Sequence, residues 1–290
     1  MRLVRFADGN RDPLGVERDG RVNVVESPSM DDLIGPGRDG IAMLGPVRER
    51  AAVARAESSL SVEHLSLLSP IRRPGKIVAV GINYAAHAAE GGRPAPADPV
   101  LFAKFPTSVI GPGDDIVWDP ALTSAVDYEA ELAVVIGRTC RRVDESTALD
   151  YVLGYTCLND VSARDLQFAD KQFVRSKSLD TFCPIGPVLV TPDEIPDPQA
   201  LRIRSYVNGE LRQDASTADM IHGVAELIAF CSRAFTLESG DVIATGTPAG
   251  VGWYREPKAL LHDGDEVVIE IEGIGRLVNR CREEPTAGAS

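Results

Sequence analysis

The stretch DYEAELAVVIG, residues 127–137, limits the folds open to this chain because it joins a buried strand to a row of acids. Successive side chains of a β-strand point to opposite faces, so Asp127, Glu129 and Glu131 share one face, while the other face is apolar throughout. Carboxylates this close together raise one another's pKa unless a cation or a bound proton compensates. The stretch therefore predicts a buried strand whose acidic end meets a metal ion, a basic partner or open water.

Length and charge bound the class of protein. The chain has 290 residues and 44% hydrophobic content, which suits one large domain or one domain with a small appendage. A formal net charge of -13 argues against a surface that binds nucleic acid or anionic lipid. A small-molecule or protein partner is favoured. No signal peptide opens the chain and no apolar run approaches the roughly 20 residues of a membrane span, so we expect a cytoplasmic protein.

The cysteines indicate neither a disulfide framework nor a structural zinc site. They are odd in number, scattered and never in a Cys-x-x-Cys arrangement. The five are Cys140, Cys157, Cys183, Cys231 and Cys281.

The pattern of elements predicts two parts. Residues 1–70 form a small β-rich N-terminal domain, with a helix-like run at 48–55. Ser-Pro and Arg-Pro-Gly sequences within residues 69–75 punctuate the chain as a linker would. Residues 71–282 form the larger domain, and residues 283–290 form a flexible tail. Strand-like pieces of the first part are residues 4–6, 14–16 and 22–25.

The larger domain contains many strands and few helices. Asn208-Gly209 between two strand-like runs is a strong hairpin signal. One convincing helix is predicted to begin near Ser216 and to place Met220, Val224 and Leu227 on one side. The fold class is therefore α+β and β-dominated. The strand-like segments are residues 76–81, 116–118, 132–136, 188–190, 201–207, 241–244 and 266–271.

A candidate base follows the strand that opens the larger domain. In GINYAAHAAE, residues 81–90, His87 and Glu90 are three positions apart, so on a helical turn the carboxylate can orient the imidazole. Such a pair suits general base work on a water molecule. An ordinary surface histidine on a solvated helix is the alternative, and taken alone this stretch favours it.

Two further stretches carry candidate ligand-binding groups. In residues 158–186, Asp160 ends a strand-like segment, Arg164 and Gln167 follow at helical spacing, and Lys177 lies in a Ser-Lys-Ser context. An acid beside two separated cations suits a metal and an anionic substrate, although a loop with surface ion pairs explains it equally well. The glycines of TGTPAGVG, beginning at Thr245, permit close backbone approach to a ligand, unless they only form a tight turn. Its threonines, Thr247 included, offer hydroxyl groups.

Together these stretches resemble the fumarylacetoacetate hydrolase family. GINYAAHAAE, VDYEAELAVVIG, NDVSARDLQ, the lysine segment and TGTPAGVG occur in the order of the family's motifs, over roughly residues 74–282. The resemblance is to the bacterial branch of acylpyruvate hydrolases and 2-hydroxyhepta-2,4-diene-1,7-dioate isomerases. It implies the family's mixed β-roll fold, preceded by a small N-terminal domain, and a homodimer.

The resemblance also implies the site. One Mg²⁺ or Mn²⁺ would be held by Glu129, Glu131 and Asp160, leaving about half of an octahedral shell open. Asp127 matches no ligand and would orient one instead. The substrate-binding residues would be Arg164, Gln167, Lys177 and Thr247. His87, oriented by Glu90, would activate the water that cleaves a 2,4-dioxo acid of the acylpyruvate type into pyruvate and a carboxylic acid. Phe105 and Trp253 would line the far end of the pocket.

Other reactions fit the same residues. Relatives of this kind decarboxylate oxaloacetate, or isomerise and decarboxylate unsaturated dioxo acids, and all of these pass through an enolate. A metal-binding scaffold without catalysis is the alternative from another class. It requires a missing ligand, base or substrate cation, and the sequence retains all of them.

Overall fold

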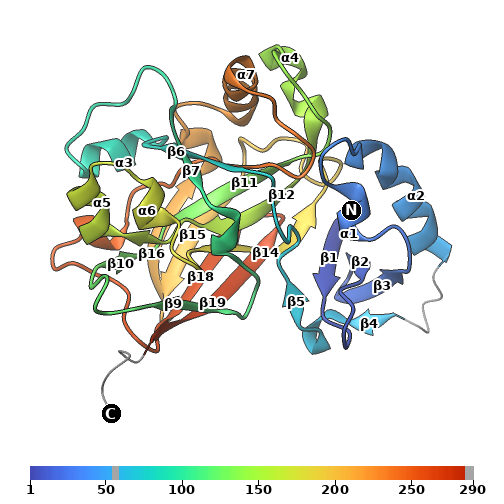
Figure 1. The fold of residues 1–290 in the computed structure, drawn as a ribbon, viewed down its shortest axis with the longest axis horizontal. Helices are drawn as coiled ribbons and strands as arrows, with labels where there is room; N and C mark the ends of the chain where they lie inside the picture. The colour runs from blue at the N-terminus through green and yellow to red at the C-terminus, as the bar shows by residue number, and fades with distance from the viewer. Residues whose placement is uncertain (54–58, 285–290) are drawn as a thin grey trace.

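The computed structural model describes residues 1–53 and 59–284 (Figure 1). The helix expected at 48–55 begins earlier, as α2 (Gly40–Val53), and its last two expected residues lie outside the described part. Of the expected tail, Glu283 is still in a strand, whereas residues 285–290 lie outside the described part. No helix among the described residues is long and apolar enough to cross a membrane.

The larger sheet is built around β11 (Ala130–Ile136), the strand expected from the acidic stretch. β11 pairs antiparallel with β12 (Val152–Asn159) on one side and with β17 (Val242–Ala244) on the other. The strand order is β4-β3-β2-β1-β14-β12-β11-β17-β6-β7, with β5 paired to β1 and β8 paired to β14. The remaining strands are β1 (Arg2–Phe6), β2 (Leu14–Arg18), β3 (Arg21–Val25), β4 (Leu60–Ser61), β5 (Leu67–Leu68), β6 (Ile77–Gly81), β7 (Val100–Lys104), β8 (Val109–Ile110) and β14 (Cys183–Val190).

The first 70 residues are rich in strands, and they extend this same sheet. β1 pairs antiparallel with β14, so the N-terminal strands continue the sheet of the larger part. In Figure 1 they form the blue end of the molecule. The division of the chain at residue 70 stays a prediction.

A second sheet, with the order β16-β15-β18-β19-β9, packs on the first. The predicted hairpin at Asn208-Gly209 is confirmed: both residues have positive φ, 52° and 78°, as a tight two-residue turn requires. A two-stranded ribbon of β10 and β13 lies beside the site. The strands are β9 (Asp115–Trp118), β10 (Val126–Asp127), β13 (Ser162–Ala163), β15 (Arg202–Val207), β16 (Glu210–Ser216), β18 (Glu266–Ile271) and β19 (Gly275–Glu283).

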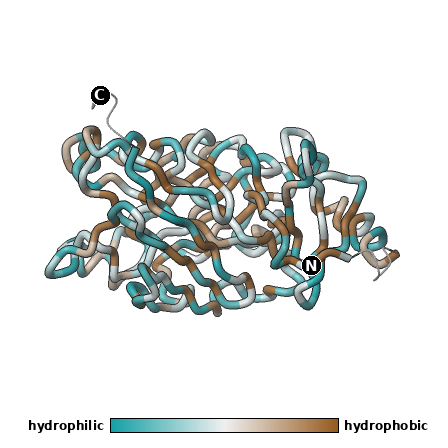
Figure 2. Tube along the Cα trace, turned by 90° about the horizontal axis from the view of Figure 1, so that it is seen from below, coloured by the Kyte–Doolittle hydropathy of each residue, from teal (hydrophilic) through white to brown (hydrophobic). Residues whose placement is uncertain are grey.

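Alternate residues of β11 belong to two different cores, as the sequence pattern predicts. Leu132 and Val134 pack in the core that also contains Ile269 of the second sheet. Ala133 and Val135 pack in the core on the opposite face of the larger sheet. Figure 2 shows hydrophobic segments mainly inside the molecule and hydrophilic segments in many of the outer turns. The acids at the start of β11 are therefore carried by a strand that is fixed on both faces.

The helix expected from Ser216 begins later than predicted. Ser216 ends β16 and caps a single 3-10 turn, and α7 (Val224–Ala234) begins only after its N-cap residue, Gly223. The backbone between them hydrogen-bonds to Asn83 instead of continuing a helix. The other helices are α1 (Met30–Leu33), α3 (Ala85–Glu90), α4 (Glu145–Ala148), α5 (Arg164–Asp170) and α6 (Val174–Lys177), with 3-10 turns at Val62–His64, Pro106–Ser108, Leu149–Tyr151, Thr217–Asp219 and Gly252–Tyr254.

Candidate active site

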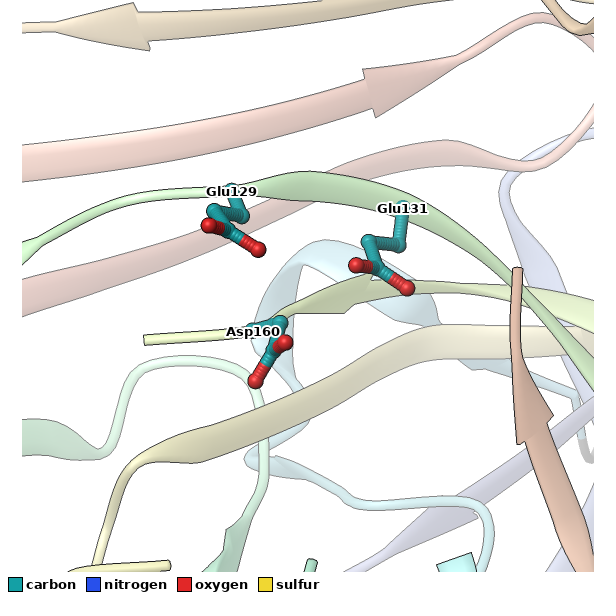
Figure 3. Close-up of side chains that lie close together, drawn as sticks. All are labelled: Glu129, Glu131 and Asp160. Atoms are coloured by element: carbon teal, nitrogen blue, oxygen red, sulfur yellow. The ribbon is translucent and has the colours of Figure 1, made fainter. Parts of the chain in front are cut away.

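Strand pairing explains why three carboxylates meet. Glu129 and Glu131 lie at the start of β11, and Asp160 follows the end of β12. Because these strands are antiparallel, with Ala130 opposite Asn159, the two ends coincide. The N–H of Asp160 donates to the carbonyl of Glu129 at 2.9 Å. One oxygen from each of the three carboxylates lies within 4.8 Å of the others, and Figure 3 shows both glutamates reaching from one strand toward Asp160.

The charges of this cluster are unevenly matched. Lys177 Nζ bonds to Glu129 at 2.7 Å and to Asp160 at 2.6 Å. Glu131 has no ion pair with any residue in the described part of the chain, and one of its oxygens accepts the N–H of Gly246 at 2.8 Å. Burial, with the nearby charges of Asp160 and Glu129, raises the pKa of Glu131 well above its usual value. Three buried carboxylate oxygens with one uncompensated acid are a donor set that fits a hard divalent cation.

Two lysines hold the acids in place. Burial alone would lower the pKa of Lys177, but Asp160 and Glu129 hold it above its usual value, so this side chain is a cation and not a base. Lys104, which the sequence analysis did not select, is fully buried and bonds to Asp160 at 2.6 Å and to the carbonyl of Lys177. Its only signal in the sequence is a single lysine within the apolar run of residues 100–105.

Asp127 lies outside the group of described residues that could hold a metal. It accepts hydrogen bonds from Arg164 Nε at 2.9 Å and from the N–H groups of Gly252 and Trp253 at 2.8 and 3.0 Å. Arg164 also bonds to Glu129 at 2.8 Å and to Gln167 at 3.0 Å. Asp127 thus positions the guanidinium of Arg164, which in turn contacts Glu129 of the carboxylate cluster.

We expect Asp127→Asn to destabilise the protein by about 3 kcal/mol, because it leaves the buried Arg164 charge without its main partner. Chemical denaturation measures the change. The matched control is Asp214→Asn, which breaks a partly exposed pair with Arg202 and should cost less than about 1 kcal/mol. Equal midpoints for the two variants would contradict this role of Asp127.

The predicted contact between His87 and Glu90 is formed. His87 Nδ1 lies 2.7 Å from Glu90 Oε1 on α3, and the other oxygen of Glu90 accepts the N–H of Gly250 at 2.9 Å. With a carboxylate at Nδ1, the Nδ1–H tautomer is favoured, which leaves Nε2 to accept a proton. The His87 ring also meets Tyr254 edge-on, with centroids 6.1 Å apart. The first motif, residues 81–90, and the last motif, residues 245–252, are therefore in direct contact.

One pocket collects most of the predicted residues. It is lined by six of them: His87, Glu129, Arg164, Gln167, Lys177 and Thr247. Gln213, for which no sequence pattern predicts a role, is buried and donates to the Thr247 hydroxyl at 2.8 Å. Glu90 lies behind His87, while Glu131 and Asp160 belong to the carboxylate cluster next to the pocket.

The aromatic wall of the pocket differs from the expectation. Phe102, Phe173 and Tyr254 line it, and the first two rings meet at a centroid distance of 5.1 Å. Phe105 and Trp253 are absent from the described lining. Phe105 is 53% exposed, and Trp253 packs against Phe168 instead.

A family model, fumarylacetoacetate (FAA) hydrolase C-terminal, matches residues 76–282. The chain belongs to the fumarylacetoacetate hydrolase family. The match covers all of the predicted site residues and begins at the strand that the sequence analysis placed at the start of the larger part. The family's β-rich α+β fold is confirmed.

Relatives within the fumarylacetoacetate hydrolase family point to oxo acids. The chain is 41% identical to oxaloacetate tautomerase fahd2, mitochondrial, of Xenopus laevis over 96% of this chain and 89% of the relative. It is 48% identical to oxaloacetate tautomerase YisK of Bacillus subtilis, over 76% and 74% of the two chains. A solved maleylpyruvate hydrolase from Sphingobium sp. SYK-6, in complex with manganese (II) ion and pyruvate, is 32% identical, with a TM-score of 0.81 over 98% of this chain and 100% of its own.

These similarities support a metal-dependent family member that acts on oxo acids. They favour the alternative, with oxaloacetate as substrate, over acylpyruvate hydrolysis, the main expectation from the sequence. The relatives are named tautomerases, whereas the alternative expected from the sequence is decarboxylation of oxaloacetate. The family motifs do not separate these reactions, because the resemblance implies the same residues for both.

Proposed function

We propose that this chain is a divalent-metal-dependent oxaloacetate tautomerase that interconverts the keto and enol forms of its substrate. Two relatives at 41% and 48% identity carry that name. The observation on which the proposal depends is the His87–Glu90 pair, which lies in the same pocket as Arg164 and Lys177 and beside the carboxylate cluster. A base next to anion-binding groups is what enolisation of an oxo acid needs.

Glu129, Glu131 and Asp160 would hold Mg²⁺ or Mn²⁺. Such a cation supplies Lewis-acid stabilisation of negative charge on substrate oxygen atoms. Mg²⁺ and Mn²⁺ both prefer oxygen ligands of this kind. The proposed cation also offsets the uncompensated acid, Glu131.

The chain's own groups account for substrate orientation. The ammonium group of Lys177 has three N–H donors, and two of them bond to Glu129 and Asp160. The third N–H remains for a substrate carboxylate in the pocket. The Thr247 hydroxyl lies on the same pocket wall and assists there. Arg164 and Gln167, bonded to each other, present N–H groups to the carbonyl oxygens.

Proton transfer is assigned to His87. Its Nε2 takes a proton from C3 of the keto form, and the C3–H bonding pair forms the C2–C3 double bond. The C2=O π pair moves to the oxygen, which takes the proton back from the His87 imidazolium. The reverse sequence regenerates the keto form, so no bond between carbon atoms breaks. Glu90 stabilises the imidazolium that forms in between, through the Nδ1–H bond.

Hydrolysis of acylpyruvates is the second candidate, and the maleylpyruvate hydrolase at 32% identity favours it. In that reaction His87 would take a proton from water, which attacks the distal carbonyl. The carbon–carbon bond then breaks to give pyruvate and a carboxylic acid.

Proton NMR of the substrates in D₂O, with purified protein and Mg²⁺ added, separates these reactions. A tautomerase should exchange the C3 protons of oxaloacetate for deuterium faster than the blank, and should leave acetylpyruvate intact. Release of pyruvate and acetate from acetylpyruvate, with oxaloacetate exchange at the blank rate, would replace the proposal by the hydrolase. Accelerated conversion of oxaloacetate to pyruvate and CO₂ would replace it by a decarboxylase.

A further inference from the structure

The pocket contains a cation that the proposed chemistry does not use. Three cationic side chains line it: Arg93, Arg164 and Lys177. Arg164 is paired with Asp127 and Glu129, and Lys177 with Glu129 and Asp160. The Arg93 guanidinium makes no hydrogen bond or ion pair with any residue in the described ranges. Of these three groups, only Arg93 keeps its full charge for a ligand.

The backbone beneath Arg93 is fixed. α3 ends in a Schellman motif, in which the N–H of Arg93 donates to the carbonyl of Ala88 at 2.9 Å and the N–H of Gly92 to that of Ala89 at 3.0 Å. Gly92 supplies the positive φ, 64°, that this ending requires. A Cβ on Gly91 would lie 3.1 Å from the Tyr254 hydroxyl, so the turn packs closely on the pocket wall. Arg93 is thus an exposed side chain anchored at the pocket rim.

The three cations of the pocket differ in whether they already have acidic partners. Lys177 and Arg164 already face acids, so they can orient one end of a substrate but cannot also neutralise a second carboxylate. A dicarboxylate such as oxaloacetate brings two negative charges into a protein of net charge -13. The second charge requires a cation that is free of other partners, and a planar guanidinium binds a carboxylate through two N–H groups.

We propose that Arg93 binds the distal carboxylate of the substrate and thereby selects four-carbon dicarboxylic 2-oxo acids over acids with a neutral end. The inference rests on the proposed function, because it assigns the substrate class of the same site. The α3 segment then carries two functions: His87 acts on the proton at C3, and Arg93 holds the carboxylate beyond that carbon.

The test compares two inhibitors that differ only in the distal carboxylate. Malate carries it and lactate does not, and neither undergoes the reaction. With Mg²⁺ present, Arg93→Gln should weaken malate binding roughly tenfold and leave lactate binding within about twofold, and Arg93→Lys should recover part of the loss. The thermal shift that each ligand produces gives the binding without any turnover. Arg73→Gln is the matched control: an exposed arginine outside the pocket lining, with the same change of charge.

Kinetics gives the second readout. Arg93→Gln should raise KM for oxaloacetate roughly tenfold and change kcat by less than about threefold, since the residue binds and does not transfer protons. Equal losses for malate and lactate, or no loss for either, would overturn the assignment of Arg93. If the parent protein does not act on oxaloacetate, the proposed function fails, and the comparison of malate with lactate still decides whether Arg93 binds a distal carboxylate.

Discussion

Replacing His87 with alanine is expected to lower kcat for oxaloacetate tautomerisation roughly 10²–10⁴-fold, the range that a positioned general base supplies. The fold should survive, because His87 is a partly buried residue of α3 whose side-chain contacts are confined to the pocket region. Steady-state kinetics with saturating Mg²⁺ measures the loss, and an unchanged melting temperature shows that the variant is folded.

Two further variants show whether the loss of kcat comes from the His87–Glu90 pair. Glu90→Gln removes the charge that stabilises the imidazolium but leaves the ring in place, so an intermediate loss of roughly tenfold is expected. His64→Ala changes an exposed histidine outside the pocket lining and should leave the rate unchanged. If His87→Ala retains its rate within a few-fold of the parent, the base must be another group and the mechanism is wrong.

Glu131→Gln is expected to act in opposite directions on stability and on activity. In metal-free protein the substitution removes a buried carboxyl group whose ionisation is opposed by burial and by the charges of Asp160 and Glu129, and the amide oxygen can still accept the N–H of Gly246. We expect the melting temperature in EDTA to rise by roughly 2–3 °C, which corresponds to about 1–2 kcal/mol for a chain of this length. The same change removes one of three carboxylate donors, so activity with Mg²⁺ should fall at least a hundredfold.

Differential scanning calorimetry with EDTA, and then with excess Mg²⁺, separates the two effects. The parent should gain stability from Mg²⁺ by ligand binding to the folded state, and Glu131→Gln should lose most of that gain. Glu63→Gln, which changes an exposed glutamate outside the cluster, should behave as the parent does. A variant that is less stable than the parent in EDTA, yet responds normally to Mg²⁺, would contradict the metal role of Glu131.

The sequence predicted most of the architecture that carries the site. Strict alternation in β11 gave the two faces of that strand, and Asn208-Gly209 gave a hairpin. Both signals are local, since side-chain period and turn geometry depend on neighbouring residues. The start of α7 was missed because the N–H groups of Ile221 and His222 bond to Asn83, more than a hundred residues away. Local propensity carries no information about such a partner.

The candidate site shows the same limit. The three carboxylates could be selected because strand spacing and family motifs mark them, whereas Lys104 and Gln213 act only through contacts between distant strands. The dual pairing of Lys177 with two acids also depends on tertiary structure. Sequence spacing identifies which groups can react, and the fold decides which of them neutralise one another.

The central claim is that this carboxylate cluster supports metal-dependent turnover of oxaloacetate. The most direct test follows the decay of the enol absorbance of oxaloacetate in a solution where the keto and enol forms have not yet equilibrated. We expect that purified protein with Mg²⁺ accelerates this decay, that excess EDTA abolishes the acceleration, and that added Mg²⁺ restores it. An acceleration that persists unchanged in EDTA, or a decay at the blank rate with Mg²⁺ and Mn²⁺ alike, would contradict it.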